Sequence, residues 1–127
     1  MFDQIHHIAI ICGDYEISKR FYRDILGFTI LAENWREASR SWKCDLKNGA
    51  AQIELFHFEG APARPTRPEA KGLRHLAFAV ASVDDAVAHL GAFGVAVEDI
   101  RIDPYTGSRF SFFADPDGLP IEVYEVM

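Results

Sequence analysis

The sequence has few cysteines and no long apolar run. Its 127 residues include only Cys12 and Cys44, which form neither a CxxC motif nor a disulfide-rich spacing. We therefore expect two reduced thiols in a cytoplasmic protein. No basic segment followed by an apolar stretch indicates a secretory signal, and no stretch is long enough to span a bilayer. We accordingly expect no association with a membrane.

The chain also has no excess of positive charge. Thirteen Lys and Arg residues against nineteen Asp and Glu residues give a formal net charge of −6, whereas a general nucleic-acid-binding protein is usually basic. The hydrophobic share of 49% and the charged share of 25% are typical of a globular domain that forms its core without disulfides. We expect one domain over residues 1–127 that binds a small molecule and no nucleic acid.

Two halves of the chain repeat one pattern. Residues 7–9 read His-Ile-Ala and residues 75–77 read His-Leu-Ala, at an offset of 68. Residues 53–55 read Ile-Glu-Leu and residues 121–123 read Ile-Glu-Val, at the same offset. A shared helix could arise by chance, but two histidines and two glutamates at one common offset indicate a duplicated module.

Each half predicts a strand, a helix and three further strands. Asp14 and Ser82 stand where helix-capping residues belong, and Gly27 and Gly94 stand where helices end. The predicted fold is therefore α+β, with two tandem βαβββ modules at about 4–58 and 72–126 and a proline-containing linker at about 59–71. The expected strands are about 5–12, 28–35, 40–47, 50–58, 73–80, 95–102, 109–115 and 120–126, and the expected helices are about 15–26 and 83–93.

Four ionisable residues recur on one side of these strands. His7, Glu54, His75 and Glu122 alternate with apolar neighbours that would pack against a helix. A carboxylate in the middle of a sheet is costly unless it is paired or bound to a metal. We therefore predict one divalent cation held by these four residues. The mixed nitrogen and oxygen donors suit Zn, Ni, Co, Mn or Fe(II), and the lack of thiolate ligands argues against a structural zinc site of the cysteine type.

Several longer segments resemble the vicinal oxygen chelate superfamily, which includes glyoxalase I, extradiol dioxygenases and antibiotic-resistance proteins. They are residues 7–10, 21–28, 74–78 and 115–122. More narrowly, the chain is similar to the YaeR-like group of glyoxalase I-like metalloproteins at Trp42-Lys43, residues 59–74 and residues 110–113.

The resemblance implies a mixed sheet that curls around the metal site, with His7, Glu54, His75 and Glu122 on the ligand positions of the glyoxalase type. It also implies a homodimer, in which each site belongs to one chain or is shared by two, and Zn or Ni as the favoured ions. Glyoxalase I proteins carry an Arg and an Asn for glutathione where this chain has Ile11 and Phe58.

The function expected from the residues and the resemblance is that of a lyase or isomerase acting on a small oxygenated substrate. The metal would stabilise an enediolate, and Glu122, or less favourably Glu54, would transfer the proton. The candidate groups for binding a substrate anion are Arg74, Arg109 and Arg36, with Arg40 and Lys43 as further cations.

Two alternatives stay open at this point. One is a non-haem iron dioxygenase of the extradiol type, which would use His7, His75 and Glu122 as its ligands. The other is a metal-free dimeric module that binds and sequesters a drug.

Overall fold

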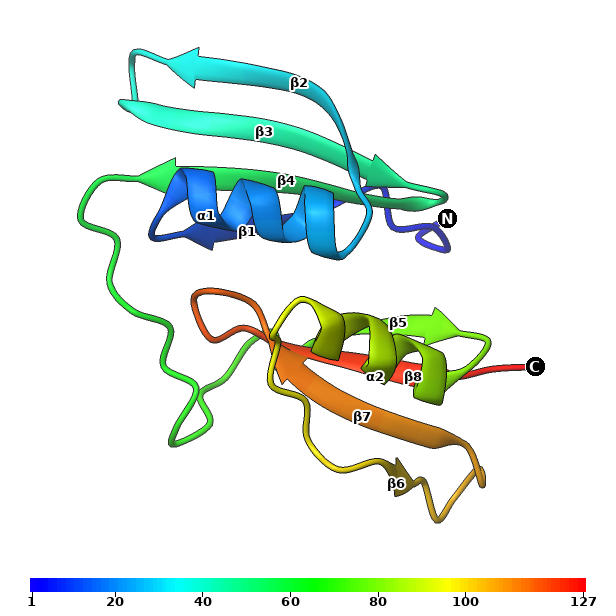
Figure 1. The fold of residues 1–127 in the computed structure, drawn as a ribbon. Helices are drawn as coiled ribbons and strands as arrows, with labels where there is room; N and C mark the ends of the chain where they lie inside the picture. The colour runs from blue at the N-terminus through cyan, green and yellow to red at the C-terminus, as the bar shows by residue number, and fades with distance from the viewer. The chain divides into compact units, whose positions relative to one another are not determined.

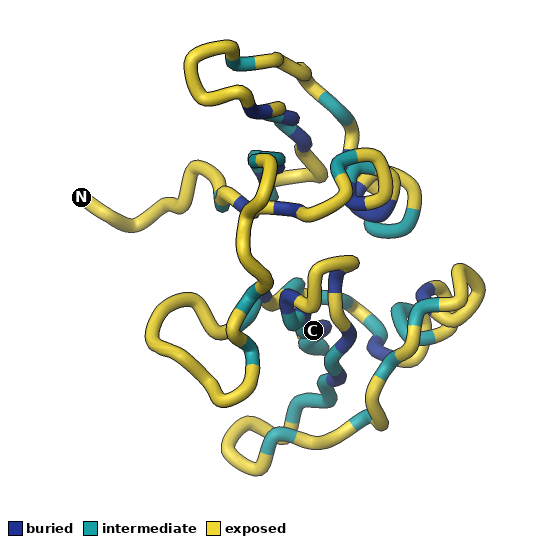
Figure 2. Tube along the Cα trace, turned by 90° about the vertical axis from the view of Figure 1, so that its left-hand side faces the viewer, coloured by how far each residue is buried: buried dark blue, intermediate teal, exposed yellow.

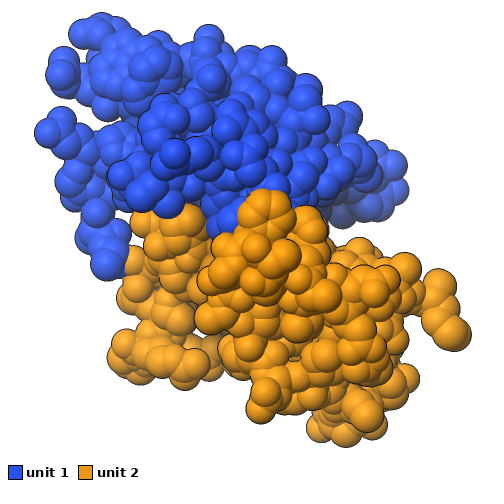
Figure 3. Space-filling view, viewed as in Figure 1, with its two compact units in different colours: residues 1–63 blue, residues 64–127 orange.

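A computed structural model describes all residues, 1–127, as two compact units, residues 1–63 and residues 64–127 (Figure 3). Each unit consists of one four-stranded mixed sheet and one helical segment (Figure 1). The predicted α+β class with tandem βαβββ modules is confirmed. None of the helices has the length and apolar character needed to cross a membrane.

The first unit forms a sheet with the strand order β1-β4-β3-β2. β1 is parallel to β4, and the other neighbours are antiparallel. The strands are β1 (Ile8–Cys12), β2 (Thr29–Arg36), β3 (Ser41–Asn48) and β4 (Ala51–Phe58).

The helix of the first unit changes its winding midway. α1 (Tyr15–Arg20) begins where the Asp14 carboxylate accepts a hydrogen bond from the Ile17 backbone N–H at 3.0 Å. It continues as a π-helical turn, η1 (Phe21–Ile25), because the Leu26 N–H donates to the Phe21 carbonyl. The chain then leaves the helix at Gly27, whose φ of +81° favours glycine.

The second unit repeats the order of elements, with the strand order β5-β8-β7-β6. β5 is parallel to β8, and Ser82 caps the helix through the Asp85 N–H. The elements are β5 (Leu76–Val80), α2 (Val83–Ala92), β6 (Arg101–Ile102), β7 (Arg109–Ala114) and β8 (Pro120–Glu125).

Two details differ from the expected elements. The ladders of β1 and β5 begin at Ile8 and Leu76, so the preceding histidines stand just before their strands and not inside them. Of the strand expected at 95–102, only 101–102 forms. The preceding segment is held at Glu98, whose N–H donates to the Phe112 carbonyl and whose carbonyl accepts from the Ser111 hydroxyl at 2.6 Å. These contacts attach the segment at one point, without a continuing ladder.

Each sheet buries one face against its helix, and the buried positions follow the strands (Figure 2). Side chains alternate along a strand, so the neighbours of each buried residue point to the opposite face. The core residues include Ile10, Cys44, Leu46, Ile53 and Leu55 in the first unit and Leu76, Leu90, Phe113, Ile121 and Val123 in the second. Glu54 and Glu122 lie between core positions and therefore stand on the opposite faces, which we call the ligand faces.

Candidate metal centre

The first unit brings His7 and Glu54 together. Glu54 lies opposite Ala9 in the parallel pairing of β1 and β4, and His7 is two residues before Ala9 on the same face. The His7 Nε2 atom lies 3.3 Å from the Glu54 Oε2 atom. The Glu54 side chain is only 14% exposed, so water solvates this carboxylate poorly.

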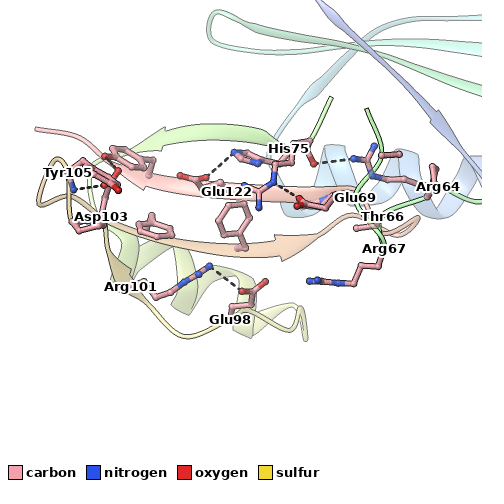
Figure 4. Close-up of a pocket in the computed structure, with 18 residues that line it drawn as sticks. Arg64, Thr66, Arg67, Glu69, His75, Glu98, Arg101, Asp103, Tyr105 and Glu122 are labelled. Atoms are coloured by element: carbon pink, nitrogen blue, oxygen red, sulfur yellow. Dashed lines mark hydrogen bonds and ion pairs between the residues drawn. The ribbon is translucent and has the colours of Figure 1, made fainter. Parts of the chain in front are cut away.

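The second unit brings His75 and Glu122 together in the same way. Glu122 lies opposite Ala77 in the pairing of β5 and β8, and His75 is two residues before Ala77. The His75 Nε2 atom lies 3.1 Å from the Glu122 Oε2 atom (Figure 4). The duplicated sequence pattern therefore corresponds to duplicated geometry within each unit.

These distances fit neighbouring ligands of one cation. Metal bonds of about 2.1 Å separate adjacent ligand atoms by about 3.0 Å in octahedral and about 3.4 Å in tetrahedral geometry. The observed separations of 3.1 and 3.3 Å fall within that interval. Neither unit by itself gathers three or more His, Cys, Asp or Glu side chains into a group that could hold a metal. Each unit thus supplies two donors, and the sharing of one ion by all four stays a prediction.

Charged neighbours surround the pair of the first unit. The Lys43 ammonium lies 2.9 Å from Asp45 Oδ1 and 3.7 Å from Glu54 Oε1. The hydrogen bond with Asp45 is the main cause that raises the pKa of Lys43, so this side chain stays positively charged beside Glu54. The Glu54 carboxylate is consequently held from two sides, by His7 and by Lys43.

An aromatic residue contacts the pair of the second unit. The Phe112 ring meets the His75 ring edge to face, with 5.0 Å between their centroids. The only ion pair of Glu122 is the one with His75. Both residues line a pocket of about 580 Å³ between the ligand face and the segment 64–74 (Figure 4).

The three predicted substrate arginines lie in different surroundings. Arg74 lines this pocket and is ion-paired with Glu69. Arg36 lies on the ligand face of the first unit, where it donates hydrogen bonds to the Ser41 hydroxyl. Arg109 points to the helix side of its sheet, because its guanidinium pairs with Asp84 of α2 at 2.7 Å. The structure therefore gives Arg109 no part in the pocket.

Other pocket residues were not predicted from the sequence. Arg101 lies over the rings of Phe110 and Phe112, and Arg67 lines the same pocket. The weak signal was the Arg-Pro-Thr-Arg-Pro stretch, whose second arginine lies in the turn at residues 66–69. No sequence pattern marked Arg101 as a pocket residue, because it lies in a strand of only two residues.

The buried cysteines do not belong to either pair. Neither cysteine forms a disulfide, and burial raises the pKa of Cys44 to about 11. A thiol with such a pKa is almost fully protonated at neutral pH, so it is a poor nucleophile and a poor metal ligand.

Comparison with known proteins identifies the family. The family model of the glyoxalase/bleomycin resistance protein/dioxygenase superfamily matches residues 4–123. YaeR of Escherichia coli, an uncharacterized protein, is 63% identical over 123 residues, which cover 96% of this chain and 95% of YaeR.

Solved structures agree with this match. The crystal structure of a glyoxalase family protein from Enterococcus faecalis superimposes with a TM-score of 0.94 at 46% identity, over 98% of each chain. FosX of Listeria monocytogenes, a fosfomycin resistance protein crystallised with Mn(II), shares the fold with a TM-score of 0.75 at 18% identity, over 100% of this chain and 95% of FosX. The chain belongs to the glyoxalase/bleomycin resistance protein/dioxygenase superfamily.

Proposed function

We propose that this protein is a metal-dependent lyase or isomerase of the glyoxalase I type, which acts on a small oxygenated substrate. The observation that carries the proposal is the recurrence of one His–Glu pair at the same register in both units. Two carboxylates and two neutral imidazoles balance the charge of a divalent cation and provide a donor set for Zn or Ni, with Co, Mn and Fe(II) as further candidates. The Mn(II) in the FosX crystal structure is consistent with a divalent ion in this fold.

The bound cation would polarise neighbouring substrate oxygens and so acidify the adjacent C–H bond. Glu122 is the carboxylate best suited to accept that proton and return it to the neighbouring carbon. Its Oε2 atom faces His75, and no salt bridge holds its second oxygen. Glu54 is less suited, because Lys43 holds its Oε1 atom. We therefore assign proton transfer to Glu122 and a fixed ligand role to Glu54.

The predicted homodimer belongs to the same proposal. Each unit contains half of the donor set, so the site is complete either within one chain or between the units of two chains. Light scattering of the purified protein measures the oligomeric state. Metal analysis of the same sample measures the number of ions per chain.

Metal content is the direct test. An imidazole N–H donating to a carboxylate gives a separation similar to that of two metal ligands, so only the ion distinguishes them. We expect wild-type protein, purified or reconstituted with Zn or Ni, to contain stoichiometric metal. His75→Ala should lose it, and His89→Ala, a histidine change on α2, should not. Wild type that stays metal-free after reconstitution, or His75→Ala that keeps its metal, would refute the proposal.

Activity screening should start with methylglyoxal and several thiols. We expect weak or no turnover with glutathione, because Ile11 and Phe58 offer no polar group to bind it. The dioxygenase alternative predicts that Glu54→Gln keeps its metal and that the iron form consumes oxygen with a catechol. The drug-binding alternative predicts that chelation leaves ligand affinity unchanged.

A further inference from the structure

Each ligand face holds an arginine over two phenylalanine rings. In the first unit, the Arg36 Cζ atom lies 4.7 Å from the centroid of the Phe56 ring and 5.7 Å from that of Phe58. In the second unit, the Arg101 Cζ atom lies 5.0 Å from the Phe110 centroid and 5.7 Å from that of Phe112. The two arginines are 65 residues apart, whereas the repeat has an offset of 68. The same arrangement therefore occurs in both units, but it is built from residues that do not correspond in the sequence repeat.

In the second unit, the arrangement extends from the His–Glu pair across the pocket. Glu122 of β8 lies opposite Phe112 of β7, and Phe110 lies opposite Arg101 of β6. Neighbouring strands are about 4.8 Å apart and two residues span about 7 Å along a strand, so the backbone positions of Glu122 and Arg101 are about 12 Å apart. An extended small molecule could therefore contact both ends.

Most charged groups that line this pocket already have partners. Arg74 is paired with Glu69, and the Asp103 carboxylate accepts hydrogen bonds from the Tyr124 hydroxyl at 3.0 Å and the Tyr105 N–H at 2.9 Å. Arg64 donates to two backbone carbonyls.

Two guanidinium groups are left for a ligand. The only ion pair of Arg101 is a 3.3 Å contact with Glu98. The two side chains are 53% and 62% exposed, so this pair contributes little to stability and is easily replaced by a ligand. Arg67 forms no salt bridge and, in Figure 4, reaches from the segment 64–74 toward Glu98 and Arg101. These two cations have hydrogen-bond donors available for an anion.

We propose that Arg67 and Arg101 bind the anionic end of the substrate, a carboxylate or phosphate group, while Phe110 and Phe112 hold the Arg101 guanidinium in place. This inference rests on the proposed function, because the other end of the molecule would present its neighbouring oxygens beside His75 and Glu122. The substrate class is then a small acid with two adjacent oxygens at one end and a second anionic group at the other.

Three 2-hydroxy acids test the proposal as matched probes. Lactate, malate and 3-phosphoglycerate share the carboxylate and the adjacent hydroxyl, but their far ends are a methyl, a carboxylate and a phosphate group. Calorimetric titration of the metal-loaded wild type should show at least about tenfold tighter binding of malate or of 3-phosphoglycerate than of lactate. One charge-assisted hydrogen bond contributes at least this much to affinity. Whichever probe is preferred identifies the anion.

Variants test which residues cause the tighter binding of a probe with a second anionic group. Arg67→Met and Arg101→Met keep side-chain length without charge, so each should reduce the preference over lactate, and the double variant should abolish it. Arg20→Met, on α1 outside the ligand faces, should keep it. Equal binding of all three probes by wild type, or a preference that survives in the double variant, would overturn the proposal.

A titration after chelation separates this inference from the proposed function. Binding of 3-phosphoglycerate or malate to metal-depleted protein that requires Arg67 and Arg101 supports the anion site even if the four-ligand metal site fails. Lactate binding that requires metal and His75, without any gain from a second anion, supports the metal site and refutes the anion site.

Discussion

The Lys43 ammonium lies 3.7 Å from Glu54 Oε1, whereas Glu122 has no lysine or arginine within salt-bridge distance. The two carboxylates of the proposed centre are therefore unequal, although their burial is similar, at 14% and 12% exposure.

This difference predicts different losses for two matched variants. Glu122→Gln should lower kcat by about 10²- to 10⁴-fold, which is the usual contribution of a general base. Glu54→Gln should chiefly lower the affinity for the metal. The loss should exceed about 10- to 100-fold, which is typical when a residue that only hydrogen-bonds to a metal ligand is removed. Metal affinity measured by competition with a chelator, together with turnover at saturating metal, distinguishes the two. Equal effects on both quantities would contradict the assignment.

The cap of α2 predicts a change in stability. The Ser82 hydroxyl accepts a hydrogen bond from the Asp85 N–H at 3.1 Å, so Ser82→Ala leaves this donor without its partner. The free energy of unfolding should fall by about 1 kcal/mol. Urea denaturation measures it, and Ser82→Asp, which keeps an acceptor, should stay close to wild type. An unchanged midpoint for Ser82→Ala would show that the cap contributes nothing.

Glu33 predicts a dependence of stability on pH. The hydrogen bonds from Lys19, at 2.8 Å, and from the Tyr15 hydroxyl, at 2.7 Å, hold the pKa of Glu33 below its usual value of 4.5. A carboxyl with a lowered folded pKa stabilises the protein above the unfolded pKa, and this contribution is lost as the pH falls through the folded pKa. About a third of the side chain is exposed, so the contribution should stay below about 1 kcal/mol.

Denaturation of Glu33→Gln and wild type at about pH 7 and about pH 3 checks this expectation. The difference in unfolding free energy should be larger at the higher pH and shrink at the lower one. Glu59→Gln, an exposed change near the end of the first unit, serves as the control. A difference that grows on acidification would have the wrong sign.

The buried thiols predict slow alkylation. Cys12 and Cys44 are at most 2% exposed, and with a pKa of about 11 only about one Cys44 thiol in a thousand is ionised at pH 8. Iodoacetamide should therefore modify the native protein far more slowly than the urea-unfolded protein, as mass spectrometry would show. Rapid labelling of native Cys44 would indicate that the first unit opens readily.

The repeat predicted most of the fold, because its signals are local. Capping at Asp14 and Ser82 and the alternation around Glu54 and Glu122 depend on neighbours within a few residues, and all are present in the structure. The common offset of 68 also identified both His–Glu pairs. The strand predicted at 95–102 was wrong over most of its length. The apolar pattern of this segment does not reveal that it attaches to β7 only at Glu98.

The surroundings of the pairs could not be predicted in the same way. Arg109 and Phe110 are adjacent in sequence but face opposite sides of the sheet, and only the structure shows Asp84 beside the arginine. Arg101 lies over Phe110 and Phe112 because the short strand β6 pairs with β7 there, and no spacing in the sequence indicated that pairing. Contacts made only in the folded protein thus determine which arginines remain available to bind a ligand.

The asymmetry between the ligand faces also bears on stereochemistry. In the proposed four-ligand shell, two equivalent carboxylates could each deliver a proton to a chelated substrate, and the product would be a mixture of enantiomers. Lys43 and Asp45 beside Glu54, and Phe112 beside His75, make the two carboxylates unequal. Delivery by only one of them would place the proton on one face of a prochiral carbon.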